Sequence, residues 1–579
     1  MSALASTPFG LLDARRSPVP VPNFRADGTQ RPDPGTLVDV RELTVRFGPG
    51  APPVVNRVSF SIARGESLAI VGESGSGKSV TSRSLVGLAG DNAVVDAHRL
   101  GFDGIDLLSI AAKRWRQLRG GRIGFVMQDA LGSLDPLRPV GREIEEPLRL
   151  HTDLAKADRA RRVIELLRAV GVPEPELRAA QYPHQLSGGL RQRALIASAI
   201  ATHPHLLIAD EPTTALDATV QAQVLELLAQ LRSRDCAMLV VSHDLAVVAQ
   251  LADRVAVMHN GVIVEQGPVG QVLQDPQHGY TKSLLRAAAS VHTLGWQAAP
   301  ATVPDSAPVV VEARGLYKAF PGPDRRRRTA VEDALFVLRA GETLGIVGGS
   351  GSGKTTLVRM VLGLEKADQG EVRVHGARLG RNGRAAKGRK RIQVVFQDPL
   401  ASFDPRWTVE RVLGEALEVA GFRGGAAQRR RAAELLELVR LDPGLLNRRP
   451  IQLSGGQRQR VAIARALAAE PEVLVCDEPV SALDVSVQAQ ILELLIDLKQ
   501  RLGLACLFIS HDLGVINRVS ERVLVMKDAR IVESGPVREI FDRPQHPYTR
   551  ALFNAIPKLQ IRQDLQEGAG GLQAARPSV

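Results

Sequence analysis

The chain has 579 residues, of which 44% are hydrophobic, so it is long enough for two domains, because a single core rarely grows beyond roughly 250 to 300 residues. Its three cysteines form no CxxC pair or other metal-ligand spacing, which indicates a reduced, cytosolic protein. No apolar run approaches the roughly 18 residues of a membrane-spanning helix, so we expect a chain that does not cross a bilayer by itself.

The net charge of +12 raises the question of a nucleic-acid partner. Basic clusters lie at 325–328, 381–391 and 429–431. Arginine runs beside acidic, helix-patterned segments are usually solvated faces, and such faces also favour an anionic membrane surface. We therefore expect no nucleic acid among the partners.

The N-terminal residues 1–36 are rich in Pro, Ala and Arg and lack the apolar stretch of a signal peptide, so we expect a disordered leader. The first clear element after it is the apolar strand "SLAIV" at 67–71. It leads into the glycine-rich loop "GESGSGKS" at 72–79, and the pattern predicts a helix over 80–88.

Further apolar strands follow at 205–209 and 237–241, separated by a helix-patterned segment at 218–231. Alternating strands and helices predict a mostly parallel sheet that is covered on both faces. The Asn-Gly pair in "RVAVMHNGVIVEQG", at 254–267, predicts a hairpin and thus an antiparallel piece near the end of the domain.

Every motif of the first half returns roughly 270 residues later, which indicates a duplicated domain. The recurring pairs are "GESGSGKS" and "GGSGSGKT", "QDALGSLDP" and "QDPLASFDP", "LSGGLRQR" and "LSGGQRQR", "ADEPTTALD" and "CDEPVSALD", "SHDL" in both halves, and "PQHGYT" and "PQHPYT". We expect domains at 37–291 and 309–557, a Pro- and Ala-rich linker at 292–308, and a disordered tail at 558–579.

The glycine-rich loops match GxxxxGK[ST] on a strand-to-helix turn, where backbone N–H groups and the helix N-terminus bind phosphate. Lys78 and Lys354 are expected to reach the β and γ phosphates, with Ser79 and Thr355 on Mg²⁺. The residues expected to bind nucleotide are Gly72, Ser74, Gly75, Ser76, Gly77, Lys78 and Ser79 in the first half and Gly348, Ser350, Gly351, Ser352, Gly353, Lys354 and Thr355 in the second.

Each half also has an apolar strand that ends in two carboxylates, Asp210 with Glu211 and Asp477 with Glu478. Phosphoryl transfer needs one carboxylate near the metal and another group that orients or deprotonates water. Asp210 and Asp477 suit the metal shell, and Glu211 and Glu478 suit the base. A solvated acidic pair is the alternative, but its recurrence before "P" and "ALD" in both halves argues against it.

With these motifs in this order, the chain resembles the ATP-binding cassette (ABC) proteins over about Leu37 to Pro557. The resemblance implies an α/β fold of two tandem P-loop domains, each with a RecA-like core, an antiparallel β subdomain and a helical subdomain. It also implies ATP and Mg²⁺ as ligands and an ATPase activity. Glu73 in the first loop is replaced by Gly349 in the second, where no side chain is needed, so we expect two competent sites.

In the family, two cassettes face head to tail, and the signature of one closes over the nucleotide of the other. The resemblance therefore implies intramolecular pairing of the two halves. The signature residues expected at the nucleotide bound by Lys354 are Ser187, Gly188 and Gly189, and those expected at the nucleotide bound by Lys78 are Ser454, Gly455 and Gly456.

The same resemblance assigns further roles. His243 and His511 are expected to contact the γ-phosphate. A lone histidine after a strand is usually structural, but the recurrence of this one in "SHDL" argues for function. Gln128 and Gln397 are expected to sense Mg²⁺ and water and to adjoin the partner-coupling surface. Phe47 and Phe320 are expected to stack on adenine, with a core role as the alternative, and Asp217 and Asp484 to lie in the loop through which the halves communicate.

The stretches after the glutamines and the "PQHGYTKSLL" and "PQHPYTRALF" segments resemble the ATP-binding subunits of dipeptide, oligopeptide, nickel and glutathione importers in a fused tandem form. Ala130 departs from this pattern where the second half has Pro399. No cysteine follows Tyr280 in the first extension or Tyr548 in the second, so we expect no iron–sulfur cluster.

The resemblance implies an ATPase that powers solute import from the cytoplasmic face of the inner membrane, as a peripheral subunit. Its expected partners are two membrane-spanning permease subunits and an extracytoplasmic solute-binding protein. The alternative is a soluble tandem ABC ATPase that acts on ribosomes or DNA; the short Pro-rich linker and the absence of zinc cysteines speak against it. A catalytically dead scaffold would require broken motifs, which neither half has.

Overall fold

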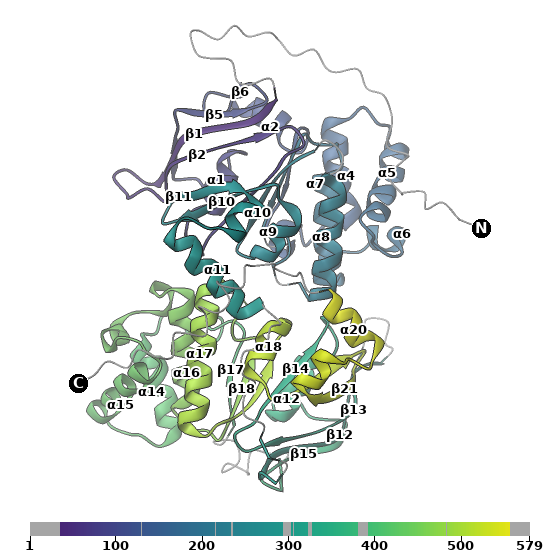
Figure 1. The fold of residues 1–579 in the computed structure, drawn as a ribbon. Helices are drawn as coiled ribbons and strands as arrows, with labels where there is room; N and C mark the ends of the chain where they lie inside the picture. Colours follow the sequence, from purple (N-terminus) through teal and green to yellow (C-terminus); the bar gives the residue numbers. More distant parts are fainter. Residues whose placement is uncertain are drawn as a thin grey trace. The chain divides into compact units, whose positions relative to one another are not determined.

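The computed structural model of the chain describes residues 35–128, 130–214, 216–232, 236–292, 303–304, 306–321, 327–379, 392–481 and 483–555. The chain divides into two compact units. The first ends at Thr281 and the second begins at Lys282, and the short stretch Ala215–Ala222 is grouped with the second unit. Figure 1 follows both units along the chain from purple to yellow.

Several predictions fall wholly or largely outside the described residues: the leader at 1–36, most of the linker at 292–308, the tail at 558–579 and the basic cluster at 381–391. The domain limits drawn from them stay predictions. Within the described ranges, no helix combines the length and the apolar character that crossing a membrane requires.

A six-stranded sheet forms the centre of the first unit, parallel except for its edge strand β11. Every residue of β3, β8 and β9 is buried, as expected for parallel strands covered by helices on both faces. The predicted strands are therefore confirmed, each to within one residue. In spatial order the strands are β11 (Val262–Pro268), β10 (Arg254–His259), β3 (Ser67–Val71), β9 (Ala237–Ser242), β8 (Leu206–Asp210) and β7 (Ile123–Val126).

The hairpin predicted from the Asn-Gly pair joins β10 and β11. Asn260 and Gly261 both have positive φ, 48° and 82°, as a two-residue hairpin turn requires. Glycine is needed at the second position because a Cβ there would lie 2.6 Å from the carbonyl oxygen of Val54.

An antiparallel sheet packs on the parallel one and corresponds to the expected β subdomain. Leu43, Phe60 and Phe102 of this sheet share one hydrophobic core with Leu68 and Ile70 of β3. Its strands are β2 (Val55–Ala63), β1 (Thr36–Phe47), β5 (Arg99–Phe102) and β6 (Ile105–Asp106), with β4 (Ala93–Asp96) also paired to β1.

Helices surround the parallel sheet (Figure 1). They are α1 (Lys78–Ser84), α2 (Ala112–Leu118), α8 (Ala218–Arg232), α9 (Leu245–Leu251) and α10 (Val269–Gln274). The helix α11 (Gly279–His292) begins in this unit, but its residues from Lys282 on are grouped with the second unit. The helix predicted over 80–88 is shorter than expected: it ends at Ser84, because the next three amides bond to carbonyls three residues back and Gly87 turns to a φ of 62°.

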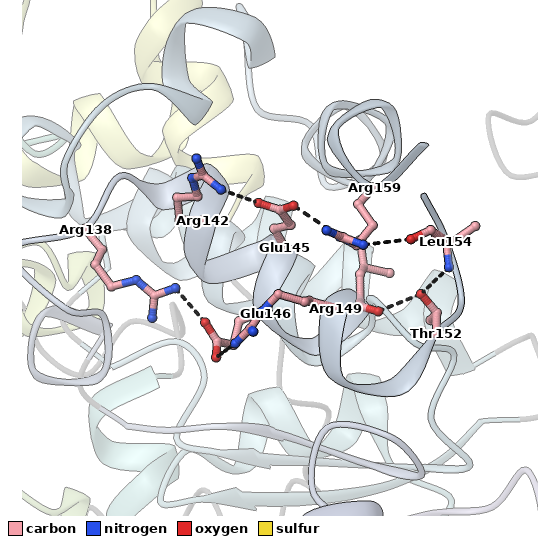
Figure 2. Close-up of polar contacts among 9 residues, drawn as sticks. Arg138, Arg142, Glu145, Glu146, Arg149, Thr152, Leu154 and Arg159 are labelled. Carbon is pink, nitrogen blue, oxygen red and sulfur yellow. Dashed lines mark hydrogen bonds and ion pairs between the residues drawn. The ribbon is translucent and has the colours of Figure 1, made fainter. Parts of the chain in front are cut away.

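A helical group lies beside the sheets, as the family resemblance implies (Figure 1). Ion pairs form within and between its helices, as Figure 2 shows. Glu145 on α4 pairs with Arg142 of the same helix, at 3.0 Å, and with Arg159 on α5, at 3.2 Å. Glu146 pairs with Arg138 and Arg149 on the other side of α4. The group consists of α3 (Ala130–Ser133), α4 (Val140–His151), α5 (Lys156–Ala169), α6 (Pro175–Ala179), the 3-10 turn η2 (Pro183–Gln185) and α7 (Gly188–Ala199).

The second unit repeats this plan, which confirms the predicted α/β fold of two tandem cassettes. Its central sheet runs β17 (Ile392–Val395), β18 (Val473–Asp477), β19 (Ala505–Ile509), β14 (Thr343–Gly348), β20 (Arg522–Lys527) and β21 (Arg530–Pro536), and its antiparallel sheet β13 (Arg327–Arg339), β12 (Val309–Pro321), β15 (Gln369–Val374) and β16 (Ala377–Arg378). Its helices and 3-10 turns are α12 (Lys354–Val361), α14 (Val409–Ala420), α15 (Gly425–Leu438), η3 (Pro443–Asn447), η4 (Pro450–Gln452), α16 (Gly455–Leu467), α17 (Val485–Leu502), α18 (Leu513–Val519), α19 (Val537–Asp542) and α20 (Pro547–Asn554).

Candidate nucleotide sites

The first glycine-rich loop connects the buried strand β3 to α1, and its glycines are sterically required. A Cβ on Gly72 would lie 2.1 Å from the carbonyl oxygen of Met258, and Gly77 has a φ of 98°. The Nζ of Lys78 donates to the carbonyl oxygens of Gly72, at 2.7 Å, and Glu73, at 2.8 Å. The lysine is thus folded back over the loop, with its cation where an anion would enter.

The second loop, between β14 and α12, has the same geometry. Lys354 Nζ donates to the carbonyl oxygens of Gly348, at 2.8 Å, and Gly349, at 2.9 Å. Burial lowers the pKa of Lys354, and the nearby carboxylate of Glu478 acts in the opposite direction. A phosphate bound at the loop would add negative charge beside this buried ammonium.

Asp210, at the end of β8, is fully buried, and its Oδ1 accepts a 2.9 Å hydrogen bond from the Ser79 hydroxyl. Burial raises the pKa of Asp210. Its Oδ2 accepts no hydrogen bond and lies 3.6 Å from Arg83 Nε. A hydroxyl beside a buried carboxylate with spare acceptor capacity fits Mg²⁺, which prefers oxygen ligands and retains water and substrate oxygens.

The second unit places Thr355 and Asp477 at the matching positions, and burial again raises the pKa of Asp477. Arg359 and Lys354 are the cations that oppose this rise. The sequence predictions gave Arg83 and Arg359 no place beside these carboxylates. The sequence feature that could have indicated them is the arginine at the fifth position after each loop lysine. In the described part of the chain, no cluster of three or more His, Cys, Asp or Glu forms a metal cage by itself.

Glu211 follows Asp210 in a strained backbone conformation, with a φ of 49°. Its carboxylate accepts from Gln128 Nε2 at 2.7 Å and from the Thr214 hydroxyl at 3.0 Å. His243 Nδ1 lies 3.4 Å from Glu211 Oε1. Gln128 and His243, from two motifs that are distant in the sequence, therefore lie against the Glu211 carboxylate.

Glu478 repeats this arrangement with a φ of 48°. Gln397 Nε2 donates to its Oε2 at 3.0 Å, and His511 Nδ1 lies 3.3 Å from the same oxygen. Burial would raise the pKa of Glu478, but the interaction with His511 outweighs it and the pKa is lowered; the same balance, with His243, lowers the pKa of Glu211. Both glutamates are therefore held ionised, as a proton acceptor must be.

The signature motifs begin helices. Ser187 caps α7 by accepting from the amide of Leu190 at 3.4 Å, and Ser454 caps α16 by accepting from the amide of Gln457 at 3.3 Å. In the second unit, Gln457 Oε1 also accepts from the Ser454 amide at 3.0 Å and completes a capping box. Leucine at 190 has no acceptor for this return bond, a difference between the units that the sequence analysis missed.

The remaining predicted residues lie at element ends. Phe47 ends β1 and is 41% exposed, and Phe320, near the end of β12, is 38% exposed, with Lys318 Nζ over its ring at 5.2 Å from the centroid. Asp217 Oδ1 accepts from the Val220 amide at the start of α8, and Asp484 is the N-cap residue of α17.

Comparison with known families identifies the chain. The family model described as "ABC transporter" matches residues 55–214 and 331–481. The chain belongs to the ABC transporter ATPases. This ABC ATPase also matches the "Oligopeptide/dipeptide transporter, C-terminal region" twice, at 264–307 and 532–577. It hydrolyses ATP to ADP and phosphate and couples that reaction to transport.

Curated relatives match this ABC ATPase over most of its length. It is 43% identical to the glutathione import ATP-binding protein GsiA of Pectobacterium atrosepticum, covering 90% of this chain and 89% of that protein. It is 46% identical to the peptidoglycan transport ATP-binding protein YejF of Agrobacterium fabrum, covering 90% and 96%. Among solved structures, a dimeric ATP-binding cassette bound to ADP and Pi is 31% identical, covering 39% of this chain and 99% of that one, with a TM-score of 0.37.

Proposed function

We propose that this ABC ATPase powers the import of a peptide-like solute and docks on the cytoplasmic face of the inner membrane. The observation that carries the proposal is the oligopeptide/dipeptide transporter C-terminal region in both units. The curated relatives add support, because their names assign glutathione import and peptidoglycan transport to proteins that match this chain over most of both lengths.

In the proposed reaction, Glu211 and Glu478 accept a proton from water as its oxygen attacks the γ-phosphorus. The bond between that phosphorus and the β–γ bridging oxygen breaks, ADP leaves, and phosphate is released. Gln128 and Gln397 orient the water, and His243 and His511 contact the γ-phosphate. The convergence of these side chains on one ionised carboxylate in each unit supports the assignment.

Mg²⁺ is proposed as the cofactor, which when bound neutralises charge on the β and γ phosphates. Ser79 and Asp210 would hold it in the first unit, and Thr355 and Asp477 in the second, with Gln128 and Gln397 alongside. The Ser79–Asp210 hydrogen bond brings two of these ligands to one place. The P-loop amides and Lys78 or Lys354 bind the phosphates, and Phe47 or Phe320 stacks on adenine.

The two units are proposed to pair within one chain, so that Ser187, Gly188 and Gly189 close over the nucleotide of Lys354. Ser454, Gly455 and Gly456 close over the nucleotide of Lys78. Each signature serine starts a helix, where backbone N–H groups are available to an anion. A Ser187→Cys and Gly351→Cys pair tests this: we expect an intramolecular disulfide that forms faster with ATP, and a purely intermolecular disulfide would contradict the pairing.

Two membrane permease subunits and an extracytoplasmic solute-binding protein are the proposed partners. Beside β7 the first unit has a cavity of about 170 Å³, lined by residues that include Val86, Leu88, Ile123, Phe125, Pro147 and Leu195. β7 leads directly to Gln128, so a cytoplasmic permease segment in this cavity would lie next to the residue that contacts the proposed base.

Co-purification tests the proposed assembly. The full chain, tagged and extracted from its native membranes in mild detergent, is expected to retain two permease proteins, identified by mass spectrometry. A Leu88→Glu and Pro147→Glu variant, which places charge in the cavity, is expected to lose them while keeping ATP binding. Recovery of ribosomes or DNA without a permease would overturn the proposal and favour the soluble alternative.

A further inference from the structure

In each unit, a tyrosine from the end of the unit contacts the phosphate loop. The amide of Glu73 donates to Tyr280 Oη at 3.2 Å, although the two residues are 207 positions apart. The amide of Gly349 donates to Tyr548 Oη at 2.7 Å across 199 positions. Both tyrosines belong to the His-X-Tyr-Thr segment of the C-terminal region, for which the proposed reaction gives no role.

The segment around Tyr280 is anchored on both sides of the ring. The Glu265 carboxylate on β11 accepts from the amides of Gln277, at 2.7 Å, and His278, at 3.1 Å, and also interacts with the Thr281 hydroxyl. His278 Nδ1 then accepts from the Tyr280 amide at 3.2 Å and starts the helix α11. The histidine of the segment therefore helps to hold the tyrosine.

The second unit uses the same bonds. The Glu533 carboxylate on β21 accepts from the amides of Gln545, at 2.7 Å, and His546, at 3.1 Å, and interacts with the Thr549 hydroxyl. His546 Nδ1 accepts from the Tyr548 amide at 3.1 Å. Recurrence of a five-residue arrangement in both units shows that the position of the hydroxyl is a feature of the fold and not of one loop.

The tyrosine rings are also held by the strand that neighbours the loop strand. The His259 ring, at the end of β10, stacks on Tyr280 with a centroid separation of 3.9 Å. At the matching position on β20, Lys527 Nζ lies 5.2 Å from the Tyr548 ring centroid. Each ring is thus fixed from its face, and each hydroxyl is aimed at the loop.

The loop peptide that receives the hydroxyl is the one that the lysine also holds. Tyr280 Oη accepts from the amide of Glu73, and Lys78 Nζ donates to the carbonyl oxygen of Gly72, which belongs to the same peptide group. Tyr548 and Lys354 hold the peptide group between Gly348 and Gly349 in the same way. The carbonyl oxygen of Glu73 also accepts from the Ser76 amide at 3.1 Å, whereas the tyrosine hydroxyl holds the amide on the other side of the residue.

We propose that Tyr280 and Tyr548 are positioning residues that hold the first peptide of each phosphate loop in its ATP-binding conformation. The C-terminal region of each unit is thereby coupled to the nucleotide of the same unit. The inference rests on the proposed phosphate-binding role of the loops. By thermodynamic reciprocity, ATP bound at a loop must also stabilise the segment that carries its tyrosine.

Hydrogen exchange tests the contact directly in the full chain. Tyr280→Phe keeps the ring and removes the hydroxyl, and we expect about 3- to 10-fold faster exchange in the peptide over residues 70–78, the range expected for one neutral hydrogen bond. The peptide over 346–354 is the internal control and is expected to stay unchanged. Tyr548→Phe must give the reverse pattern. Equal exchange of both loops in both variants would overturn the proposal.

Steady-state kinetics test the consequence. In the Tyr280→Phe and Tyr548→Phe double variant, the KM for ATP is expected to rise about 3- to 10-fold with kcat nearly unchanged, because the loop binds substrate and transition state alike. Tyr317→Phe, whose hydroxyl faces Thr329, is the matched control. A lower kcat at unchanged KM, or wild-type values for both, would overturn the inference.

One further variant separates this inference from the function on which it rests. Lys78→Ala combined with Lys354→Ala must abolish ATP binding if the loops bind phosphate, whatever the tyrosines do. If this lysine variant binds ATP normally, the proposed sites fail. If it loses ATP but the tyrosine variants behave as wild type, only the positioning role fails.

Discussion

Gln128 donates a 2.7 Å hydrogen bond to the carboxylate of Glu211, and so links the end of β7 to the residue that follows β8. Gln397 and Glu478 form the same link at 3.0 Å. Because the cavity proposed for the permease lies beside β7, a displacement of that strand end reaches the proposed base through a single side chain.

Removing the base from both units tests the catalytic assignment. In Glu211→Gln combined with Glu478→Gln, the ATPase rate is expected to fall by about 10²-fold or more, since the amide cannot accept the proton. ATP binding is expected to remain, because neither residue belongs to the phosphate loop. Phosphate release and equilibrium binding measure the two effects. Glu226→Gln, on the exposed face of α8, is the control, and undiminished hydrolysis in the double variant would contradict the assignment.

Gly349 should tolerate a side chain poorly because of its tyrosine. A Cβ at this position would lie 3.2 Å from Tyr548 Oη, so Gly349→Ala must push the hydroxyl outward and lengthen the hydrogen bond. We expect faster hydrogen exchange at 346–354 by about 3-fold, within the range of one weakened bond. Glu73→Ala retains the Cβ of the first loop and is expected to leave hydrogen exchange at 70–78 unchanged. Equal changes of exchange in both loops would count against the tyrosine contact.

The incomplete cap of α7 gives the two signature helices different stabilities at their first turn. Gln457→Leu removes the return bond to Ser454 and is expected to destabilise the start of α16 by about 0.5 to 1 kcal/mol. Leu190→Gln adds the acceptor to α7 and is expected to stabilise its start by a similar amount. Amide exchange over 187–191 and 454–458 measures both; the idea fails if the two substitutions shift exchange in the same direction.

Glu521 is a buried structural acid of the second unit. It pairs with Lys499, whose side chain is also mostly buried, and accepts from the amide of Thr343 at the start of β14. Glu521→Ala leaves the lysine buried without its partner and is expected to cost about 3 to 5 kcal/mol in the free energy of unfolding of this unit. Asp497→Ala breaks pairs with Arg440 and Arg501, whose side chains are more than half exposed, and is expected to cost less than about 1 kcal/mol. Urea denaturation followed by hydrogen exchange compares them, and similar losses would refute the distinction.

The predictions from sequence succeeded where the physics is local. Gly72 and Gly77 are required because backbone atoms of neighbouring segments leave no room for a Cβ, and the Asn260–Gly261 pair adopts the positive φ values of a common two-residue hairpin turn. The helix after the first loop was predicted too long, because the pattern of apolar residues continues past Ser84 while the backbone tightens into a turn that ends at Gly87.

The sequence by itself determined the duplicated plan, the loop chemistry and the types of residue at each site, because short motifs carry these in their order and spacing. Only the tertiary structure decided which distant groups meet. Tyr280 contacts Glu73 across 207 residues because β10 and the hairpin after it return the chain to the edge of β3. A hydrogen bond depends on the path of the backbone to within a fraction of an ångström, and no spacing in the sequence encodes that path.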